Sequence, residues 1–435
     1  MKVGETFKDF LSNLSIKNDA TIELRYGEIT SALNRKFRDT ESKSNNCLQV
    51  GSYGRWTAIN GISDLDMLYI MPGSKWQDYN IIGGQSKILD DVKDAIKARY
   101  PFTNIKKDRL VVCVTYKDFH VEVQPVFEQA DGSFKYPDTY NGGSWKTTKP
   151  REEINAMKEF NSEKNKNLRR LCKMARAWKN YHGVGMGGLL IDTLAYNFLS
   201  NTSFYDNKSY LYYDWMCRDF FEYLSDQPKQ DRYAALGSSQ HVKVKKDFRK
   251  AAKKAYDLSI KAIQANADEE EDVNKKWKKI FGRNFPAKPV AVAEARVIKS
   301  FNQFRDTEEF IEDKYPVDIR YNLELDCSVD QNGFRPGLLR TFLSNRLPLS
   351  VKKDLRFFIS ESDVVEPYSV HWKVLNRGPK AIAKDCIRGQ ITEDNGKREQ
   401  IESTSFSGEH IVECYAVKDG VVVAKGRIDV PISEV

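Results

Sequence analysis

The feature that most constrains this chain is the seven-residue run Asp64-Leu-Asp-Met-Leu-Tyr-Ile70, which has two acids at its start and apolar residues behind them. Alternate residues of a β-strand project to the same face, so a strand here sets the carboxylates of Asp64 and Asp66 side by side. Two such groups repel each other unless a cation lies between them. Oxygen ligands with open positions suit Mg²⁺, which shares its shell with water and substrate phosphates. The run therefore predicts a strand that carries a metal site.

A glycine-serine turn precedes this strand. Gly51-Ser52 follows the apolar segment Leu48-Gln-Val50 and leads into what we expect to be a helix. Backbone N–H groups at such a turn, together with the serine hydroxyl, can hold a triphosphate. An isolated Asp-x-Asp is more often just a polar strand end. With a phosphate-binding turn beside it, however, the pair has the minimum equipment for in-line nucleotidyl transfer.

Three regions of the chain differ in their patterns. A chain of 435 residues is expected to form two or three domains, because one hydrophobic core rarely grows beyond about 250–300 residues. Residues 1–150 mix strands and helices, which predicts an α/β core with an N-terminal helix, and residues 151–300 predict a helical lobe. The helices are expected at 20–40, 84–99, 165–179, 189–199 and 242–266, and the core strands at 64–70, 110–116 and 120–124, the last stopped by Pro125.

The third region, residues 315–435, favours short alternating strands. Turns such as Lys418-Asp-Gly420 separate them. Strands at this spacing predict a C-terminal domain that is mainly β and sandwich-like. Its clearest strands are expected at 368–374, 410–417 and 421–428.

Composition excludes several classes of protein. The 69 basic and 61 acidic residues give a net charge of +8, which fits nucleoside triphosphates as ligands but does not by itself identify a nucleic-acid binder. The seven cysteines are scattered, without the spacing of a zinc site or a disulfide framework, and we expect a reducing, cytoplasmic setting. No uncharged apolar run approaches 18 residues, so no membrane span is expected.

A family resemblance enters with the block from Gln49 to Asp66, Gln-Val-Gly-Ser-Tyr-Gly-Arg-Trp-Thr-Ala-Ile-Asn-Gly-Ile-Ser-Asp-Leu-Asp. It resembles the signature of the polymerase-β-like nucleotidyltransferases, and within them the bacterial relatives of cyclic GMP-AMP synthase and oligoadenylate synthase. The resemblance implies an α/β polymerase-β-like core with a helical lobe and two Mg²⁺ or Mn²⁺ ions per active site. It also implies template-independent polymerisation of nucleoside triphosphates into a cyclic or short linear oligonucleotide signal in anti-phage defence, read by an effector protein that senses the product.

The same resemblance implies a third catalytic acid. Such enzymes carry an acid in a following strand, in a pattern that Val121-Glu-Val-Gln-Pro125 matches. The usual residue is aspartate, so Glu122 is a departure. We expect Asp64, Asp66 and Glu122 to be the catalytic metal ligands, with Asp118 the nearest alternative to Glu122.

Three further residues are implied as nucleotide ligands beside Gly51 and Ser52. Arg176 stands two residues before Trp178, where relatives hold a basic residue on the triphosphate, and Lys173 lies on the same helical face. Ser238, in the turn Gly237-Ser-Ser239, is a weaker candidate for contact with the nucleobase. A solvated basic face is the alternative interpretation of the helix. Gly188 occupies the place where relatives often carry a serine or glutamine that touches the donor, so that contact is not carried over.

The C-terminal region resembles an accessory domain found behind some of these enzymes and proposed to sense a nucleotide or related ligand. The matching runs are 367–378 and 387–391. Within them, Trp372 and Arg388 could form a stacking and anion-binding pair. A strand tryptophan is more often part of a sandwich core.

Two other functions remain open at this point. One is a nucleotidyltransferase that tails an RNA or modifies a protein. The other is a catalytically silent sensor whose core only binds nucleotide. The three acids argue against silence, and Glu122 is the one feature in its favour.

Overall fold

The computed structural model describes residues 3–265, 270–286, 308–330, 337–345, 349–351, 353–376, 388–404 and 407–433. The chain forms two compact units. Unit 1 comprises Met1–Trp178 and Gly187–Pro286, and unit 2 comprises Lys179–Met186 and Ala287–Val435. The boundary predicted between residues 300 and 315 lies mostly outside the described residues.

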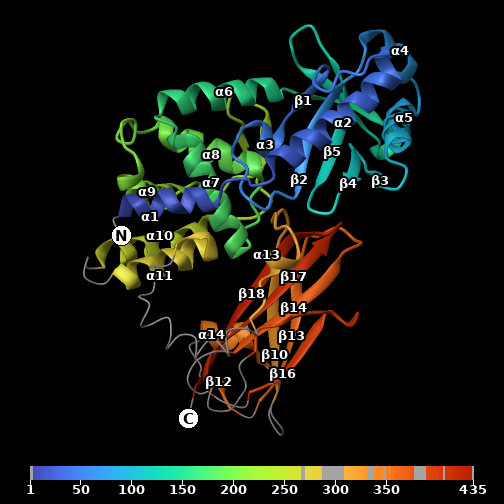
Figure 1. Ribbon diagram of the computed structural model, residues 1–435. Coiled ribbons are helices and arrows are strands. Elements are labelled where there is room, and N and C mark those ends of the chain that lie inside the picture. Colours follow the sequence, from blue (N-terminus) through green and yellow to red (C-terminus); the bar gives the residue numbers. More distant parts are fainter. Residues whose placement is uncertain are drawn as a thin grey trace. The chain divides into compact units, whose positions relative to one another are not determined.

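The core of unit 1 is a seven-stranded mixed sheet (Figure 1). Its main strands follow the order β1-β2-β5-β4-β3, and only β2 and β5 are parallel among these pairs. The strands are β1 (Cys47–Gln49), β2 (Asp64–Ile70), β3 (Asn104–Lys107), β4 (Val112–Thr115) and β5 (His120–Glu128), with β6 (Phe134–Asp138) and β7 (Ser144–Thr148) continuing from the end of β5.

Two helices cover one face of this sheet. Buried side chains of α2 (Asp19–Arg38) and α5 (Gly84–Arg99) pack on Leu65, Met67 and Tyr69 of β2 and on the alternate valines of β5. Because strand residues alternate between faces, Asp64 and Asp66 project to the opposite face. The hydrophobic half of the strand pattern thus anchors the sheet, and the acidic half stays accessible.

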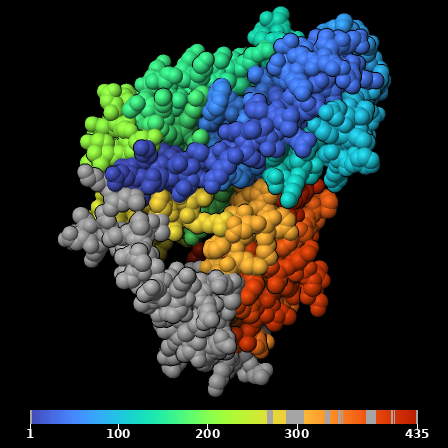
Figure 2. Space-filling view, viewed as in Figure 1, coloured from blue at the N-terminus to red at the C-terminus, as the bar shows by residue number. Residues whose placement is uncertain are grey.

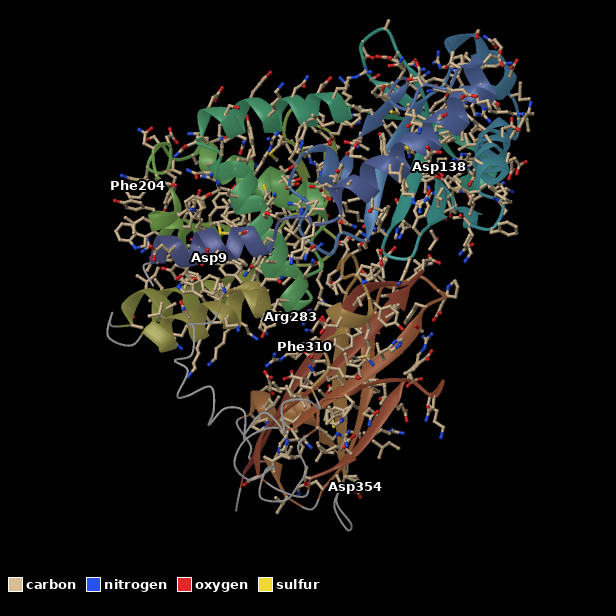
Figure 3. All side chains as sticks on the ribbon, viewed as in Figure 1. Asp9, Asp138, Phe204, Arg283, Phe310 and Asp354 are labelled. Atoms are coloured by element: carbon tan, nitrogen blue, oxygen red, sulfur yellow. The ribbon has the colours of Figure 1, made fainter. Side chains whose placement is uncertain are left out.

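The sheet's far end is tied by a buried carboxylate. Asp138, labelled in Figure 3, lies at the end of β6 and accepts hydrogen bonds from Arg109 Nε at 2.5 Å and from Arg109 Nη2 at 2.6 Å. Lys146 of β7 lies 2.5 Å away on the same carboxylate. The bonds from Arg109 hold the pKa of Asp138 well below its usual range, so the group stays ionised and clamps the β6–β7 hairpin.

The rest of unit 1 is a lobe of helices. Pro150 sits at the first turn of α6, a position where its missing N–H costs no bond. The helices α1 and α2 follow each other along one face of unit 1 (dark blue, Figure 2). Phe7 of α1 meets Trp277 edge-on at 5.2 Å, so the N-terminal helix is packed into the lobe. The elements are α1 (Val3–Asn13), α6 (Pro150–Glu163), α7 (Asn167–His182), α8 (Gly188–Ser200), α9 (Tyr213–Ser225), α10 (Arg249–Gln264) and α11 (Glu270–Phe281). The end of α7, from Lys179, is assigned to unit 2.

Two predicted boundaries are wrong. Strand β5 does not stop at Pro125, because pairing with β4 ends at Val123 and pairing with β6 begins at Phe127. Pro125 therefore has a strand partner on one side only, where a sheet tolerates proline. The helix predicted over 242–266 begins later, at Arg249, since His241–Lys243 forms strand β9 against β8 (Arg232–Ala234) and Asp247 accepts the Arg249 N–H at 3.0 Å.

Unit 2 contains two sheets that share one core, as the sandwich prediction requires. One has the order β11-β10-β13-β16 and the other β12-β18-β17-β14-β15. Buried residues of both, among them Leu325, Phe357 and Trp372, form a single hydrophobic cluster. The strands are β10 (Leu323–Asp330), β11 (Gly337–Leu338), β12 (Leu349–Ser350), β13 (Asp354–Ser362), β14 (Ser369–Asn376), β15 (Ile391–Glu393), β16 (Glu399–Ser403), β17 (Gly408–Lys418) and β18 (Val421–Ser433).

The turn between β17 and β18 shows how the sequence sets this pairing. Asp419 and Gly420 both have positive φ, 49° and 79°, which matches the twist of a tight hairpin. Across both units, none of the described helices is long and apolar enough to cross a membrane.

Candidate active site

The three predicted acids lie on neighbouring strands. The parallel register of β2 and β5 pairs Asp66 with Glu122 and Asp64 with His120. Paired residues share a face of the sheet, so Glu122 projects beside the Asp64 and Asp66 side chains on the face away from α2 and α5. All three acids are partly exposed. Residues 56 positions apart in sequence are thus brought to one place by strand pairing.

The Gly51-Ser52 turn touches this group directly. Gly51 begins the short helix α3 (Gly51–Gly54) with φ of +63°, in the left-handed region that favours glycine. A Cβ added there would lie 1.7 Å from Asp66 Oδ2. The backbone N–H of Val50 also donates to the Asp66 carbonyl at 3.0 Å. The turn therefore contacts a predicted metal ligand at a distance that no side chain at position 51 permits.

Two residues that the sequence reasoning missed flank the acids. Ser63 is fully buried and donates its hydroxyl to Asp64 Oδ1 at 2.7 Å. His120 is buried, with Nε2 at 3.6 Å from Glu122 Oε1. Ser63 directly precedes the Asp-x-Asp pair and His120 lies two residues before Glu122, and these positions were the signal from which the sequence could have identified them. Ser63 thus orients one carboxylate, and His120 lies beside another.

The donor set fits a hard divalent cation in its chemistry, since it consists of carboxylate oxygens on one face beside a phosphate-binding turn. Within the part of the chain that the structure describes, no three histidine, cysteine, aspartate or glutamate side chains converge closely enough to hold a metal ion. Ser63 bonds one carboxylate, and His120 lies near another. Strand pairing nevertheless brings the three carboxylates to one face of the sheet.

Behind the turn lies a buried ionic network centred on Asp192 of α8. Its carboxylate is fully buried and accepts bonds from Arg176 Nη1 at 2.6 Å and Nη2 at 2.9 Å, and from Arg55 Nε at 2.9 Å. Thr57 Oγ1 donates to it at 3.1 Å. Burial alone would raise the pKa of Asp192, but the charges of Arg176 and Arg55 outweigh burial and lower it to about 2. Asp192 is thus ionised.

This network changes the interpretation of Arg176. Its guanidinium is buried and binds Asp192 with two nitrogens, while Nη2 also donates to the Gly188 carbonyl at 3.1 Å. A Cβ at Gly188 would lie 3.1 Å from that nitrogen, so glycine leaves room for the guanidinium. Arg176 therefore supports the loop after the turn through Asp192, and its expected contact with the triphosphate stays a prediction.

Ser238, a predicted nucleotide ligand, is also joined to this network. It is 8% exposed, and its hydroxyl donates to Glu153 Oε1 of α6 at 3.1 Å. Glu153 in turn lies 3.5 Å from Arg55 Nη1. Ser238 is therefore joined to the buried network, because its turn packs on α6 and not toward an open space.

Lys173, the third of the predicted nucleotide ligands outside the turn, lies beside other cations. It is partly exposed, and burial followed by the positive charges of Arg169 and Arg176 lowers its pKa. Arg169, which the sequence reasoning also missed, stacks 4.5 Å over the Trp56 ring, and its Nε and Nη2 have no hydrogen-bond partner among the described residues. Clustered cations of this kind favour a nearby anion.

In unit 2, Trp372 belongs to the sandwich core, the more frequent of the two interpretations, and it does not form a stacking and anion-binding pair with Arg388. Trp372 is 2% exposed, belongs to the sandwich core and donates Nε1–H to Asp394 Oδ1 at 3.0 Å. Arg388 pairs with Glu402. Alternation along β14 directs the tryptophan inward with Val370 and Val374.

Two family models match the chain. Residues 1–161 match the Second Messenger Oligonucleotide or Dinucleotide Synthetase domain, SMODS, and residues 305–433 match the Adenylyl/Guanylyl and SMODS C-terminal sensor domain. The chain is a SMODS-type nucleotidyltransferase. The SMODS match contains the Gly51-Ser52 turn and all three acids, and the sensor-domain match covers the strands of unit 2.

Relatives of this SMODS enzyme agree with that assignment. A probable cyclic nucleotide synthase from Bacillus cereus (strain VD146) is 20% identical over 273 residues, which cover 54% of this chain and 81% of the relative. The solved structure of E. coli CdnC with ATP has a TM-score of 0.50 at 16% identity and covers 65% of this chain and 98% of CdnC. CdnC in complex with HORMA-deltaN gives the same coverage and TM-score at 15% identity. The likeness confirms the polymerase-β-like core with its helical lobe.

Proposed function

We propose that this protein joins nucleoside triphosphates, without a template, into a cyclic or short linear oligonucleotide signal and releases pyrophosphate. One observation carries the proposal: the β2–β5 register brings Glu122 beside Asp66, whose carboxylate in turn touches the Gly51-Ser52 turn. Metal-binding acids and a phosphate-binding turn are thereby in direct contact. The Bacillus cereus relative, named as a probable cyclic nucleotide synthase, supports the type of product.

Asp64, Asp66 and Glu122 are the residues that would hold two Mg²⁺ or Mn²⁺ ions. Bound there, the ions would supply charge stabilisation at the attacking and leaving oxygens. In the reaction the acceptor 3′-oxygen forms a bond to the α-phosphorus of the donor, while the bond from that phosphorus to the pyrophosphate oxygen breaks. Ser63 holds the Asp64 carboxylate by its hydrogen bond, and His120 lies beside Glu122.

The donor triphosphate would lie on the Gly51-Ser52 turn. Backbone N–H groups and the Ser52 hydroxyl bind its oxygens, and Lys173 adds a positive charge from α7. Arg176 and Ser238 support the site from the buried network behind the turn. CdnC, which shares this fold, has been solved with ATP, which supports a nucleoside triphosphate as the ligand.

The wider role follows from the family resemblance. The signal would act in anti-phage defence by way of an effector protein that recognises it. Unit 2 would bind a ligand of its own and adjust the activity of unit 1, in keeping with its match to a sensor domain. These parts of the proposal are tested in cells by loss of phage resistance after substitution of Asp64.

One rival function has a specific observation behind it. A catalytically silent sensor would tolerate glutamate at position 122, and among the described residues no three such side chains lie close enough together to hold a metal ion. Turnover separates this rival from the enzyme. A tailing enzyme, the other rival, would require added RNA or protein as acceptor.

The experiment is incubation of the purified full chain with each labelled nucleoside triphosphate, alone and in mixtures, with Mg²⁺ or Mn²⁺. We expect oligonucleotide products. Cyclic products should resist phosphatase, and linear products should lose their terminal phosphates to it. The matched control is Asp64→Asn with Asp66→Asn, which keeps the strand but removes two carboxylates. Equal product from both proteins would end the proposal, as would the absence of product from wild type under every combination.

A further inference from the structure

A strained tryptophan follows the phosphate-binding turn. Trp56 has φ of 58°, in the left-handed region that strongly disfavours a side chain of this size. Its side chain is 53% exposed, so no buried cavity rewards the conformation. Arg169 stacks on the ring at 4.5 Å. An exposed contact of that kind is weaker than the backbone preference it would have to overcome.

The residues on either side of Trp56 explain how the strain persists. Arg55 and Thr57 are both buried, and both bind the Asp192 carboxylate, at 2.9 Å and 3.1 Å. Asp192 belongs to α8, 135 residues beyond Thr57 in sequence. With both flanks fixed to one rigid acceptor, the residue between them has little freedom. Strained backbone persists where its surroundings over-determine it.

The strained residue is coupled to the turn by hydrogen bonds. The backbone N–H groups of Thr57 and Ala58 donate to the Ser52 carbonyl at 2.9 Å and 3.1 Å. The Arg55 N–H donates to the Gly51 carbonyl at 3.2 Å. A relaxation of Trp56 toward negative φ would move Thr57, and with it the carbonyl of the residue that carries the phosphate-binding hydroxyl.

We propose that Asp192 is a positioning residue of the active site: by holding Arg55 and Thr57 it keeps Trp56 in its left-handed conformation and so fixes the Gly51-Ser52 turn. The inference rests on the proposed function, because it takes the turn as the binding site of the donor triphosphate. Asp192 does not touch the triphosphate. It acts through the loop.

The test is a double-mutant cycle on nucleotide affinity. Labelled ATP with Mg²⁺ is bound to wild type, Asp192→Asn, Trp56→Gly and the double variant, and the dissociation constant is measured by equilibrium dialysis. Asp192→Asn should weaken binding about tenfold in the wild-type background, in the range set by the left-handed preference. In the Trp56→Gly background it should weaken binding by at most about threefold, because glycine needs no clamp at this φ.

Two controls separate positioning from general stability. Asn141, exposed in another turn, also has positive φ, at 50°, and Asn141→Gly should leave the tenfold effect of Asp192→Asn in place. If Asp192→Asn does not fold, Thr57→Val removes one bond of the clamp and keeps the buried charges paired. Its smaller loss of affinity should likewise shrink in the Trp56→Gly background.

The outcomes are distinct for the two proposals. An equal loss of affinity from Asp192→Asn with and without Trp56→Gly would overturn the positioning role, as would an unchanged affinity in Asp192→Asn alone. Wild type that binds ATP but makes no product from any nucleotide would overturn the proposed function. The affinity cycle could still be read in that case.

Discussion

Replacement of Gly51 by alanine tests the contact on which the proposed site depends. A Cβ there would stand 1.7 Å from Asp66 Oδ2, so the carboxylate must retreat by about 1.7 Å to reach the ordinary contact distance of 3.4 Å. A displacement of that size at a reacting centre costs about 100-fold in rate. The left-handed φ adds about 1–2 kcal/mol of destabilisation.

The matched control is Gly132→Ala in the β5–β6 turn. Gly132 has φ of +78° and nothing within 4 Å of its added Cβ, so it carries the backbone penalty without the clash. Both variants should lower the unfolding temperature by about 2–8 °C. Only Gly51→Ala should lose about 100-fold in product formation, measured from labelled nucleoside triphosphates with Mg²⁺. If the two variants turn over at similar rates, Asp66 is not held against the turn as described.

Three further predictions concern single side chains. Glu122→Gln should lower kcat by about 100-fold and change KM little in steady-state assays, because a third carboxylate acts on charge that develops in the transition state. Glu122→Asp should keep part of the activity. Normal turnover of Glu122→Gln would make Asp118, which is exposed in the β4–β5 turn, the next candidate for the third acid. Ser52→Ala should weaken nucleotide binding by about 1–3 kcal/mol in equilibrium dialysis, and indifference to the change would make Ser52 a turn residue only. The difference in free energy of unfolding between wild type and Asp192→Asn, measured in urea, should stay constant from pH 7 to about 4 and shrink below that. The reason is that the pKa of Asp192 is about 2 in the folded protein and about 3.9 in the unfolded chain. A difference already lost at pH 5 would contradict the ionised network.

The catalytic strand was predictable because its signal is local. Asp64 and Asp66 lie on one face of the strand by alternation alone, and the apolar residues that alternate with them identify the buried face. Gly51 was identified as a turn residue from its neighbours, but its contact with Asp66 was not, since that depends on how β1 pairs with β2. The local sequence pattern therefore predicted the strand and the turn but not the distance between them.

Arg176 shows where sequence reasoning ends. A basic residue on an amphipathic helix gives the same sequence pattern whether its partner is a ligand or a buried carboxylate. Asp192, its actual partner, lies in a helix that reads as continuous apolar core, and Arg55 lies 137 residues away from Asp192. No periodicity links residues so far apart, so the network could be found only in three dimensions.

Proline 125 illustrates the same limit in secondary structure. A proline after five strand residues predicts an end, yet β5 continues to Glu128 because β4 and β6 leave a gap opposite that position. Likewise, Val242 belongs to a two-stranded hairpin and not to the helix that its lysine-rich neighbours suggested. In both cases tertiary pairing overrode local preference.

The division of the chain into units has a consequence for its biosynthesis. Residues 179–186 belong to unit 2, but residue 287, where the rest of that unit begins, leaves the ribosome about 100 residues later. At ~5–20 residues per second, this interval is about 5–20 s. Val184 and Met186 are buried in the finished protein, but during this interval the strands of unit 2 have not yet been synthesised. A nascent chain paused in this interval presents these two apolar side chains to chaperones, and slow codons between residues 187 and 287 should lower the yield of folded protein.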